Sequence, residues 1–311
     1  MLRQLLRLWD FDASAYLALY PDLFRTGNAT WRQALKHWFF NGRKEGRIFP
    51  LRSDPKALRS HPGRIIIDVT TTCNLTCGDC NRFCHIPQLR SEIHLTPAQV
   101  EHFVRECRET GRQWDLIRLE GGEATLNPHF PEILVILSRA REDLFPQGEV
   151  MLISNGVAEE TKRLCQELPE WVTLFDSGKA DLPPDYHQAM TVAPCDMENL
   201  QDHDFSRGCA LPAIYGLGLT PHGYYPHPIC GAIDRALGLN LGLKHLPQDD
   251  YADLQACRDS LCRVCGWYLY MGIDLPMNRN LGEMESEQGH SKSWEEIIAN
   301  SHEKITRLTP Y

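Results

Sequence analysis

The sequence predicts an α/β fold with a parallel sheet, because short apolar runs alternate with helix-like stretches from residue 64 onward. The runs that are typical of buried strands read RIIIDVT (64–70), LIRLE (116–120), VMLIS (150–154) and WVTLF (171–175). The regular alternation fades after residue 177. With 311 residues, the chain is long enough for one large or two small domains with a buried core.

Helix signals fill the stretch between the first two strands. Thr96 is the predicted N-cap, Gln99 can complete a capping box with it, and Gly111 can end the helix. The apolar face of this helix includes Cys107, which we therefore expect in the core, together with Cys165 in TKRLCQELPE. A second helix is expected in HFPEILVILSRA, after the second strand.

Composition and charge restrict the classes of partner. The net charge of −9 argues against non-specific binding to nucleic acid or to an anionic membrane, because both are polyanions. The N-terminal segment MLRQLLRLWDFDAS does not have the pattern of a signal peptide, and no run of about eighteen apolar residues follows. We expect a cytoplasmic protein whose substrate is a small molecule or a short peptide.

Cysteine usage points to metal chemistry, because twelve cysteines in a reducing compartment rarely form a disulfide framework. Cys73, Cys77 and Cys80 form a CxxxCxxC motif in the loop after the first strand. An iron–sulfur cubane held by only three protein thiolates keeps one iron open for another ligand. The alternative is a zinc site, in which Cys84 or His85 would supply the fourth ligand.

Two more motifs follow the next two predicted strands. EGGEATLNP comes after the second strand and SNG ends the third, so in a parallel sheet all three loops converge on one edge. No Lys-Ser or Lys-Thr pair follows the glycines, which argues against a phosphate-binding loop. Together the three loops resemble those of the radical S-adenosylmethionine (SAM) superfamily.

This resemblance implies a [4Fe–4S] cluster on the three cysteines, with SAM chelating the open iron. It implies that Gly121, Gly122 and Glu123 lie against the SAM amino group. It also implies that Ser154 and Asn155 contact the ribose or methionine part of SAM. Asp79 stands where the family usually has an aromatic residue near the adenine.

The C-terminal cysteines form a second group. The order is one cysteine before a predicted hairpin, one after it, and then a CxxC pair, and it resembles the twitch half of SPASM extensions. The resemblance implies a closed auxiliary [4Fe–4S] cluster with four protein ligands, Cys209, Cys230, Cys262 and Cys265. Zinc with His222 or His227 is the alternative, and His227 could also replace Cys230 in the cluster.

Other candidate residues are less tied to a motif. Cys195 and Cys84 could donate a hydrogen atom to a substrate radical, or could be inert packing residues. Cys257 is expected to be structural. Asp176 and Lys179, after the fourth strand, are candidates for a base, and the alternative is an ordinary polar loop.

The N-terminal residues differ from the rest in being rich in aromatic residues. They resemble a short helical module found beside glycosyltransferases, and the alternative is a helical cap on the main domain. The predicted fold is thus a partial (β/α)6 radical SAM barrel with a small C-terminal twitch-like domain and an N-terminal helical module. The predicted boundaries are 1–55 for the module, 60–200 for the barrel, 201–275 for the twitch-like domain and 276–311 for a C-terminal tail.

The layout is similar to that of the aminocyclitol dehydrogenases within the superfamily. The resemblance implies that a 5′-deoxyadenosyl radical abstracts hydrogen from an alcohol-bearing carbohydrate or cyclitol, giving a ketone or, by epimerisation, an inverted centre. A flavodoxin or ferredoxin would supply the electron. The alternatives are a peptide-modifying radical SAM enzyme and a non-catalytic, metal-stabilised binding protein.

Overall fold

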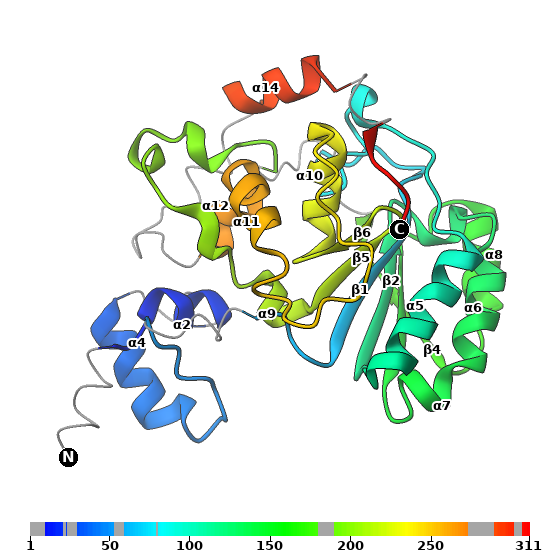
Figure 1. Cartoon of the computed structure of the whole chain (residues 1–311), viewed down its shortest axis with the longest axis horizontal. Helices are drawn as coiled ribbons and strands as arrows, with labels where there is room; N and C mark the ends of the chain where they lie inside the picture. The colour runs from blue at the N-terminus through cyan, green and yellow to red at the C-terminus, as the bar shows by residue number, and fades with distance from the viewer. Residues whose placement is uncertain are drawn as a thin grey trace.

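The protein is seen here as a computed structural model in which residues 10–20, 23, 30–52, 59–78, 80–179, 190–272, 289–301 and 307–311 are described. A central sheet separates two groups of helices, and a small helical unit lies at the N-terminal side (Figure 1). The predicted α/β class with a parallel sheet is confirmed. Among the described helices, none has the length and apolar character needed to cross a membrane.

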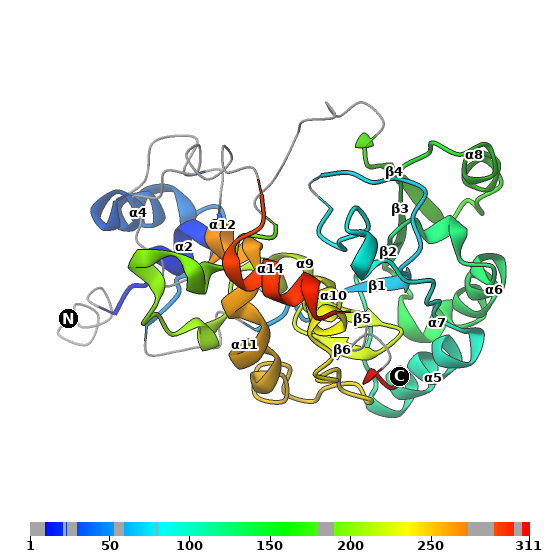
Figure 2. The same cartoon turned by 90° about the horizontal axis from the view of Figure 1, so that it is seen from above.

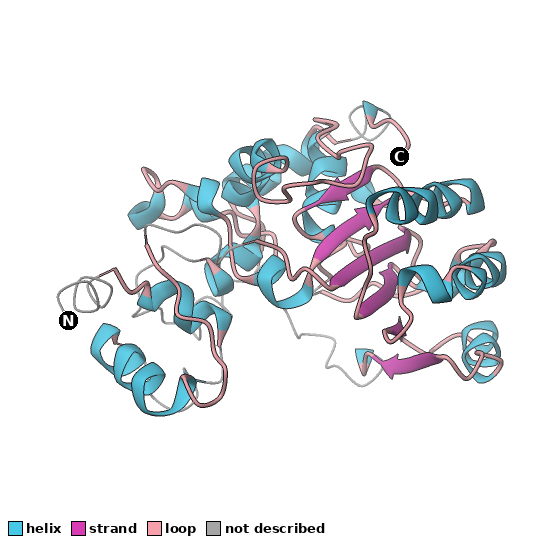
Figure 3. Ribbon diagram, turned by 60° about the horizontal axis from the view of Figure 1, so that its bottom comes forward, coloured by secondary structure: helices cyan, strands magenta, loops and turns pink. Residues whose placement is uncertain are grey.

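The sheet has six strands in the order β4-β3-β2-β1-β5-β6. Its first four strands are parallel and coincide with the four predicted apolar runs, within a residue at each end. They are β1 (Arg64–Thr70), β2 (Leu116–Gly121), β3 (Glu149–Ser154) and β4 (Val172–Asp176). Figure 3 shows these strands side by side, with helices along their length.

The predicted hairpin completes the sheet on the other side of β1. It consists of β5 (Leu217–Thr220) and β6 (Gly223–Tyr225), which pair antiparallel, while β5 pairs parallel with β1. Gly223 has a φ of 121°, and a Cβ there would lie 2.3 Å from the carbonyl oxygen of Leu243. The turn therefore needs glycine. The βα alternation thus runs through four strands, and a hairpin from a distant part of the chain extends the sheet.

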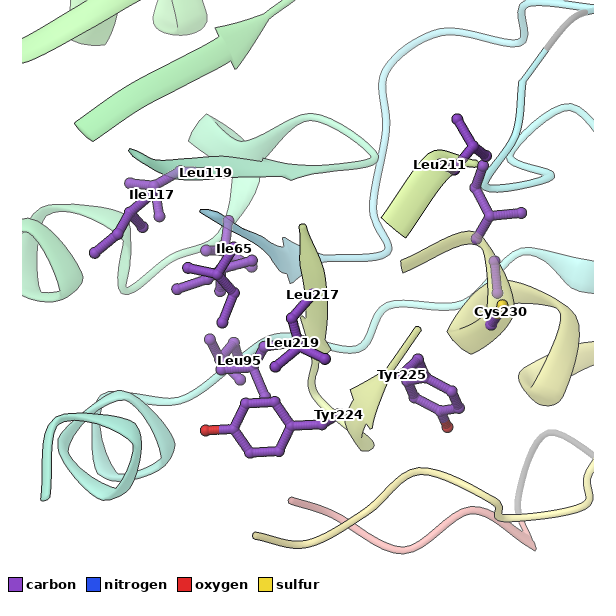
Figure 4. Close-up of a cluster of buried hydrophobic side chains, with 14 of the residues drawn as sticks. Ile65, Leu95, Ile117, Leu119, Leu211, Leu217, Leu219, Tyr224, Tyr225 and Cys230 are labelled. Carbon is purple, nitrogen blue, oxygen red and sulfur yellow. The ribbon is translucent and has the colours of Figure 1, made fainter. Parts of the chain in front are cut away.

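One face of the sheet is covered by the helices that connect its parallel strands (Figure 1). The predicted capping box on α5 is present, because Thr96 and Gln99 cap each other, and Gly111 ends the helix in the left-handed region at a φ of 68°. Ile65, Ile117 and Leu119 point from the strands into the core, as Figure 4 shows. These helices are α5 (Pro97–Thr110), α6 (Phe130–Arg139), α7 (Arg141–Leu144) and α8 (Glu159–Gln166).

The C-terminal half packs beside the hairpin. Helix α10 (Pro228–Leu237) lies on β5, β6 and β1, and the indole nitrogen of Trp294 donates to the carbonyl oxygen of Val264 at 2.8 Å. That bond joins the last helix to the segment that carries the CxxC pair. The helices of this half are α9 (Leu211–Tyr215), α10 (Pro228–Leu237), α11 (Gln255–Leu261), α12 (Gly266–Met271) and α14 (Lys292–Ala299).

The N-terminal unit contains α2 (Ala13–Leu19) and α4 (Trp31–His37) around its own aromatic core. It lies beside α12 and away from α5 and α6 in both Figure 1 and Figure 2. One oxygen of Asp12 accepts from the backbone of Ala15 and caps α2, and the other accepts from Arg207 at 3.2 Å. The unit is therefore tied to the segment just before Cys209.

Candidate functional site

A cavity of about 210 Å³ opens where β1, β2 and β3 end. The loops after these three strands supply most of its wall, as expected for the carboxyl edge of a parallel sheet. The cavity contains the three cysteines of the CxxxCxxC motif, the glycine-rich loop and the end of β3. The predicted site residues in its wall are Cys73, Cys77, Cys80, Gly121, Gly122, Glu123, Ser154, Asn155 and Lys179.

The cysteine loop favours thiolates. Hydrogen bonding with the neighbouring Cys84 side chain is the largest cause of a lowered pKa at both Cys73 and Cys80, and the pKa of Cys80 falls further. The backbone nitrogens of Leu75 and Cys84 donate to these two sulfurs at 3.4 and 3.3 Å. Because thiolates are the form that binds iron, this environment suits a metal-ligating loop.

The two glycines allow the second loop to touch the first. The backbone nitrogen of Gly122 donates to the Thr70 carbonyl at 2.9 Å, and that of Glu123 donates to Thr72 at 2.8 Å. A Cβ on Gly122 would lie 2.1 Å from the Thr72 carbonyl oxygen and 3.0 Å from the Cβ of Cys73. Only glycine fits this approach, so the glycine-rich loop is held directly against the cysteine loop.

Glu123 is only 1% exposed and is held by four hydrogen bonds. Its Oε1 accepts from Thr125 and from the Ser154 hydroxyl at 2.9 Å. Its Oε2 accepts a single bond, from the Asn155 backbone nitrogen at 2.8 Å, which leaves that oxygen with capacity for another donor. A fixed carboxylate in a cavity wall suits recognition of an ammonium group.

Ser154 and Asn155 therefore donate hydrogen bonds to the Glu123 carboxylate in this structure. The amide of Asn155 donates to the side chain of Asn74 at 2.9 Å, so it also links β3 to the cysteine loop. Their predicted contacts with the ribose or methionine of SAM stay a prediction. Asp79, which was expected near the adenine, lies outside the described residues.

A second, smaller cavity of about 30 Å³ lies between α10 and α11 and the segment after α11. All four predicted auxiliary ligands line it: Cys209, Cys230, Cys262 and Cys265. Burial raises the pKa of Cys209 to about 12 and raises that of Cys265 well above its ordinary value. For Cys262 the largest cause of a raised pKa is a hydrogen bond with Cys230, followed by burial. Figure 4 places Cys230 near Leu211, at the far side of the core from β2.

The two histidines considered as ligands lie in different places. His227 lines the second cavity, but its Nδ1 accepts from the Ile229 backbone nitrogen and caps α10. Burial lowers the pKa of His227 well below its ordinary value. His222 lines a separate cavity of about 20 Å³. Within the described part of the chain, no three His, Cys, Asp or Glu side chains meet closely enough to hold a single metal ion.

The candidates for hydrogen donor and base are spread over the molecule. Cys84 is buried behind the cysteine loop, where its thiol lies 3.7 Å from the Thr71 carbonyl. Cys195 lies beside the start of α14, with its sulfur 3.7 Å from the Ser293 hydroxyl. Neither of these two cysteines lines the larger cavity, and neither does the exposed Asp176, which forms a turn with Gly178.

The expected structural cysteines are found in packed positions. Cys107 is 1% exposed, and the indole nitrogen of Trp114 donates to its sulfur at 3.4 Å. Cys257 is equally buried on α11, whereas Cys165 is half-buried against the main core. The core prediction is therefore confirmed for Cys107, whereas Cys165 lies at the edge of the core. The burial of Cys257 agrees with its expected structural role.

The sequence analysis missed three charged residues in the larger cavity: Arg82, Arg118 and Glu120. A signal for two of them was available. The strand LIRLE alternates apolar and charged residues, and successive side chains of a strand point to opposite faces. Charges at every second position of a strand that is buried in a parallel sheet indicate a polar interior.

Comparison with known proteins agrees with this arrangement. Residues 67–194 match the family model described as the radical SAM superfamily, and this segment contains the end of β1, all of β2 to β4 and the cavity wall. No curated protein matches the chain.

Two solved structures were found to be similar to the chain. A crystal structure of BtrN in complex with AdoMet and 2-DOIA is 12% identical with a TM-score of 0.39, over 67% of this chain and 94% of that chain. A structure of selenomethionine BtrN in an open conformation is 14% identical with a TM-score of 0.35, over 70% and 92%.

The residues present fit the cofactors that this superfamily implies, a [4Fe–4S] cluster and SAM. Three sulfurs meet one cavity, two of them with lowered pKa values, and the glycines bring a fixed carboxylate to the same wall. The matched segment, the cysteine motif and the loop contacts therefore agree, and residues 67–194 form a radical SAM domain.

Proposed function

We propose that this radical SAM enzyme is a dehydrogenase that oxidises an alcohol-bearing carbohydrate or cyclitol to a ketone. The observation that carries the proposal is the second cavity, whose wall contains Cys209, Cys230, Cys262 and Cys265. Four thiolates would close the coordination of an auxiliary [4Fe–4S] cluster and leave it no open iron, which suits electron transfer.

In the larger cavity, Cys73, Cys77 and Cys80 would hold the first cluster, and Glu123 would accept a hydrogen bond from the SAM ammonium group. When bound, the cluster and SAM supply a 5′-deoxyadenosyl radical that takes a hydrogen atom from substrate. Ser154 and the backbone of Asn155 keep the Glu123 carboxylate in place. A flavodoxin or ferredoxin is the proposed electron donor.

Oxidation of an alcohol carbon removes one hydrogen atom, one proton and one electron in sequence. The bound SAM would supply the acceptor of the hydrogen atom, and a base would accept the hydroxyl proton. An auxiliary cluster held by Cys209, Cys230, Cys262 and Cys265 would accept the electron. Lys179 lines the cavity and, in its neutral form, is a candidate base, whereas Asp176 is exposed at the end of β4. An epimerase would instead need a thiol that returns a hydrogen atom. The contacts of Cys195 with Asp196 and Ser293 support a passive role for this thiol.

Turnover in deuterated water tests the assignment. A dehydrogenase gives a two-electron oxidised product with no deuterium at the reacting carbon, and the Cys195→Ala variant keeps most of the activity. A product whose mass is unchanged after turnover in ordinary water, and which carries one deuterium after turnover in deuterated water, would instead identify an epimerase. Loss of that product in Cys195→Ala would identify Cys195 as the donor. The same loss in Cys84→Ala would assign the donor role to Cys84. Modification of a short peptide and of no polyol would favour peptide maturation.

A further inference from the structure

The interior face of β2 carries charges where a parallel sheet is usually apolar. Ile117 and Leu119 point into the hydrophobic core, while Arg118 and Glu120, on the opposite face, line the larger cavity. Glu120 lies directly across from Asp68 in the register of β2 and β1. Two carboxylates therefore stand side by side on this face of the sheet, where they need a cationic partner.

Arg82, two residues beyond the third cysteine, supplies that partner. Its guanidinium binds both oxygens of Asp68, at 2.7 and 2.9 Å, and contacts Oε2 of Glu120 at 3.3 Å. The bidentate pair occupies Asp68, so this carboxylate is structural. Of these three contacts of Arg82, Glu120 accepts only the longest, at 3.3 Å.

The pair formed by Arg118 and Glu120 has fewer hydrogen bonds than the pair formed by Arg82 and Asp68. An Nη of Arg118 lies 2.8 Å from Oε1 of Glu120, but the contact does not have hydrogen-bond geometry. Neither Oε1 of Glu120 nor Nε of Arg118 has a hydrogen-bond partner among the described residues, although both atoms are buried. Buried polar atoms are nearly always hydrogen-bonded, so an unpartnered donor beside an unpartnered acceptor indicates a site that a ligand completes.

We propose that Arg118 and Glu120 bind two hydroxyl groups of the substrate. Arg118 donates to one hydroxyl oxygen, and Glu120 accepts from the neighbouring hydroxyl. A vicinal diol has the donors and acceptors for both contacts. The Tyr215 ring lies 5.4 Å from the Arg118 guanidinium, and this cation–π contact helps to hold the arginine in place. This inference rests on the proposed function, because it names the residues that would hold its substrate.

The charges around this part of the cavity also restrict the substrate. Both arginines contact Glu120, and Arg82 also binds the two oxygens of Asp68. A phosphate would have to break the contacts of Glu120 with the two arginines in order to bind them. The substrate class is therefore an unphosphorylated polyol.

Equilibrium binding tests the pair without turnover. Anaerobically reconstituted enzyme, saturated with SAM and kept unreduced, is titrated by calorimetry with myo-inositol, glucose, glucosamine and their monophosphates. The variants are Glu120→Gln and Arg118→Lys, which keep the size of Glu120 and the charge of Arg118. The matched control is Glu160→Gln, which changes an exposed carboxylate that is also paired with an arginine.

We expect at least one of the unphosphorylated polyols to bind the wild type and Glu160→Gln with equal affinity. The same polyol should bind both cavity variants at least about tenfold more weakly, which is about 1.4 kcal/mol. SAM affinity should stay unchanged in all three variants. Equal polyol affinity in the cavity variants would refute the role of the pair. If only the monophosphates bind, or if none of the tested compounds binds, the substrate is not an unphosphorylated polyol.

The proposed function can be refuted independently of this inference. It fails if the reduced wild type cleaves SAM but oxidises no polyol. If polyol oxidation proceeds, and KM for the polyol is the same in Glu120→Gln as in the wild type, only the inference about the pair is wrong.

Discussion

The two cysteine sets use the same residue type in opposite surroundings. Cys73, Cys77 and Cys80 line a cavity of about 210 Å³, where a neighbouring thiol lowers the pKa of two of them. The four C-terminal cysteines line a cavity of about 30 Å³, where burial raises the pKa values of Cys209 and Cys265. The first environment keeps thiolates near open space for an exchanging ligand. The second makes thiolates costly unless bound cations neutralise them.

The largest effect is expected from removing the first set. The triple variant Cys73→Ala, Cys77→Ala, Cys80→Ala should lose all reductive cleavage of SAM, because no open iron remains. Its iron content should fall from about eight atoms per chain to about half, since the second set is independent. Iron assays and quantification of 5′-deoxyadenosine check this. Zinc without iron in the wild type would end the two-cluster interpretation.

Removing the second set should separate the two halves of the reaction. The Cys262→Ala, Cys265→Ala variant should also keep about four irons. The auxiliary cluster should not assemble with two of its four ligands removed, whereas the first cluster should be unaffected. The variant should still cleave SAM, but it should release no two-electron oxidised product. Parallel assays of 5′-deoxyadenosine and ketone measure the split. If ketone formation follows SAM cleavage as in the wild type, the second set does not carry electrons.

A smaller effect is expected at the carboxylate of the first cavity. Glu123→Ala removes a charge-assisted hydrogen bond worth about 1.5 to 3 kcal/mol. SAM should therefore bind about ten- to a hundredfold more weakly, with both clusters assembled. Calorimetry against the control Glu132→Ala, at an exposed carboxylate, measures the change. Unchanged SAM affinity would mean that the cofactor is held elsewhere.

The smallest effect is expected at cysteines outside both sets. Cys107→Ala and Cys257→Ala should leave iron content and SAM cleavage unchanged. Each should lower the free energy of unfolding by about 1 kcal/mol, because a buried side chain is shortened. Denaturant titration of the anaerobic protein provides the value. Loss of iron in Cys257→Ala would extend the second set.

Local signals predicted the strands and the capped helix well. The run RIIIDVT matches β1 residue for residue, and Thr96, Gln99 and Gly111 determine the ends of α5 through bonds among near neighbours. The pairing of β5 with β1 had no such signal, because it joins residues about 150 positions apart in the chain. The hairpin could be recognised from its turn, but its place in the sheet depends on tertiary packing.

The site was predictable to the extent that spacing determines it. Cysteine spacing and the strand-end loops brought the first set and Glu123 to one cavity, as the topology requires. The partners of Glu123 could not be predicted, because Ser154 approaches it from another strand, 31 positions away in sequence. Arg118 and Glu120 were visible in the alternation of β2, but their sequence was interpreted only as an apolar strand.

The two hydrogen bonds of Asp12 have a consequence for the evolution of this protein. One oxygen of Asp12 caps α2, and the other holds Arg207, which shares a wall with the second cysteine set. Recombination that exchanged the N-terminal unit alone would remove this acceptor and alter that wall. We therefore expect the N-terminal unit and the C-terminal cysteines to be inherited together, although nearly two hundred residues separate Asp12 from Arg207.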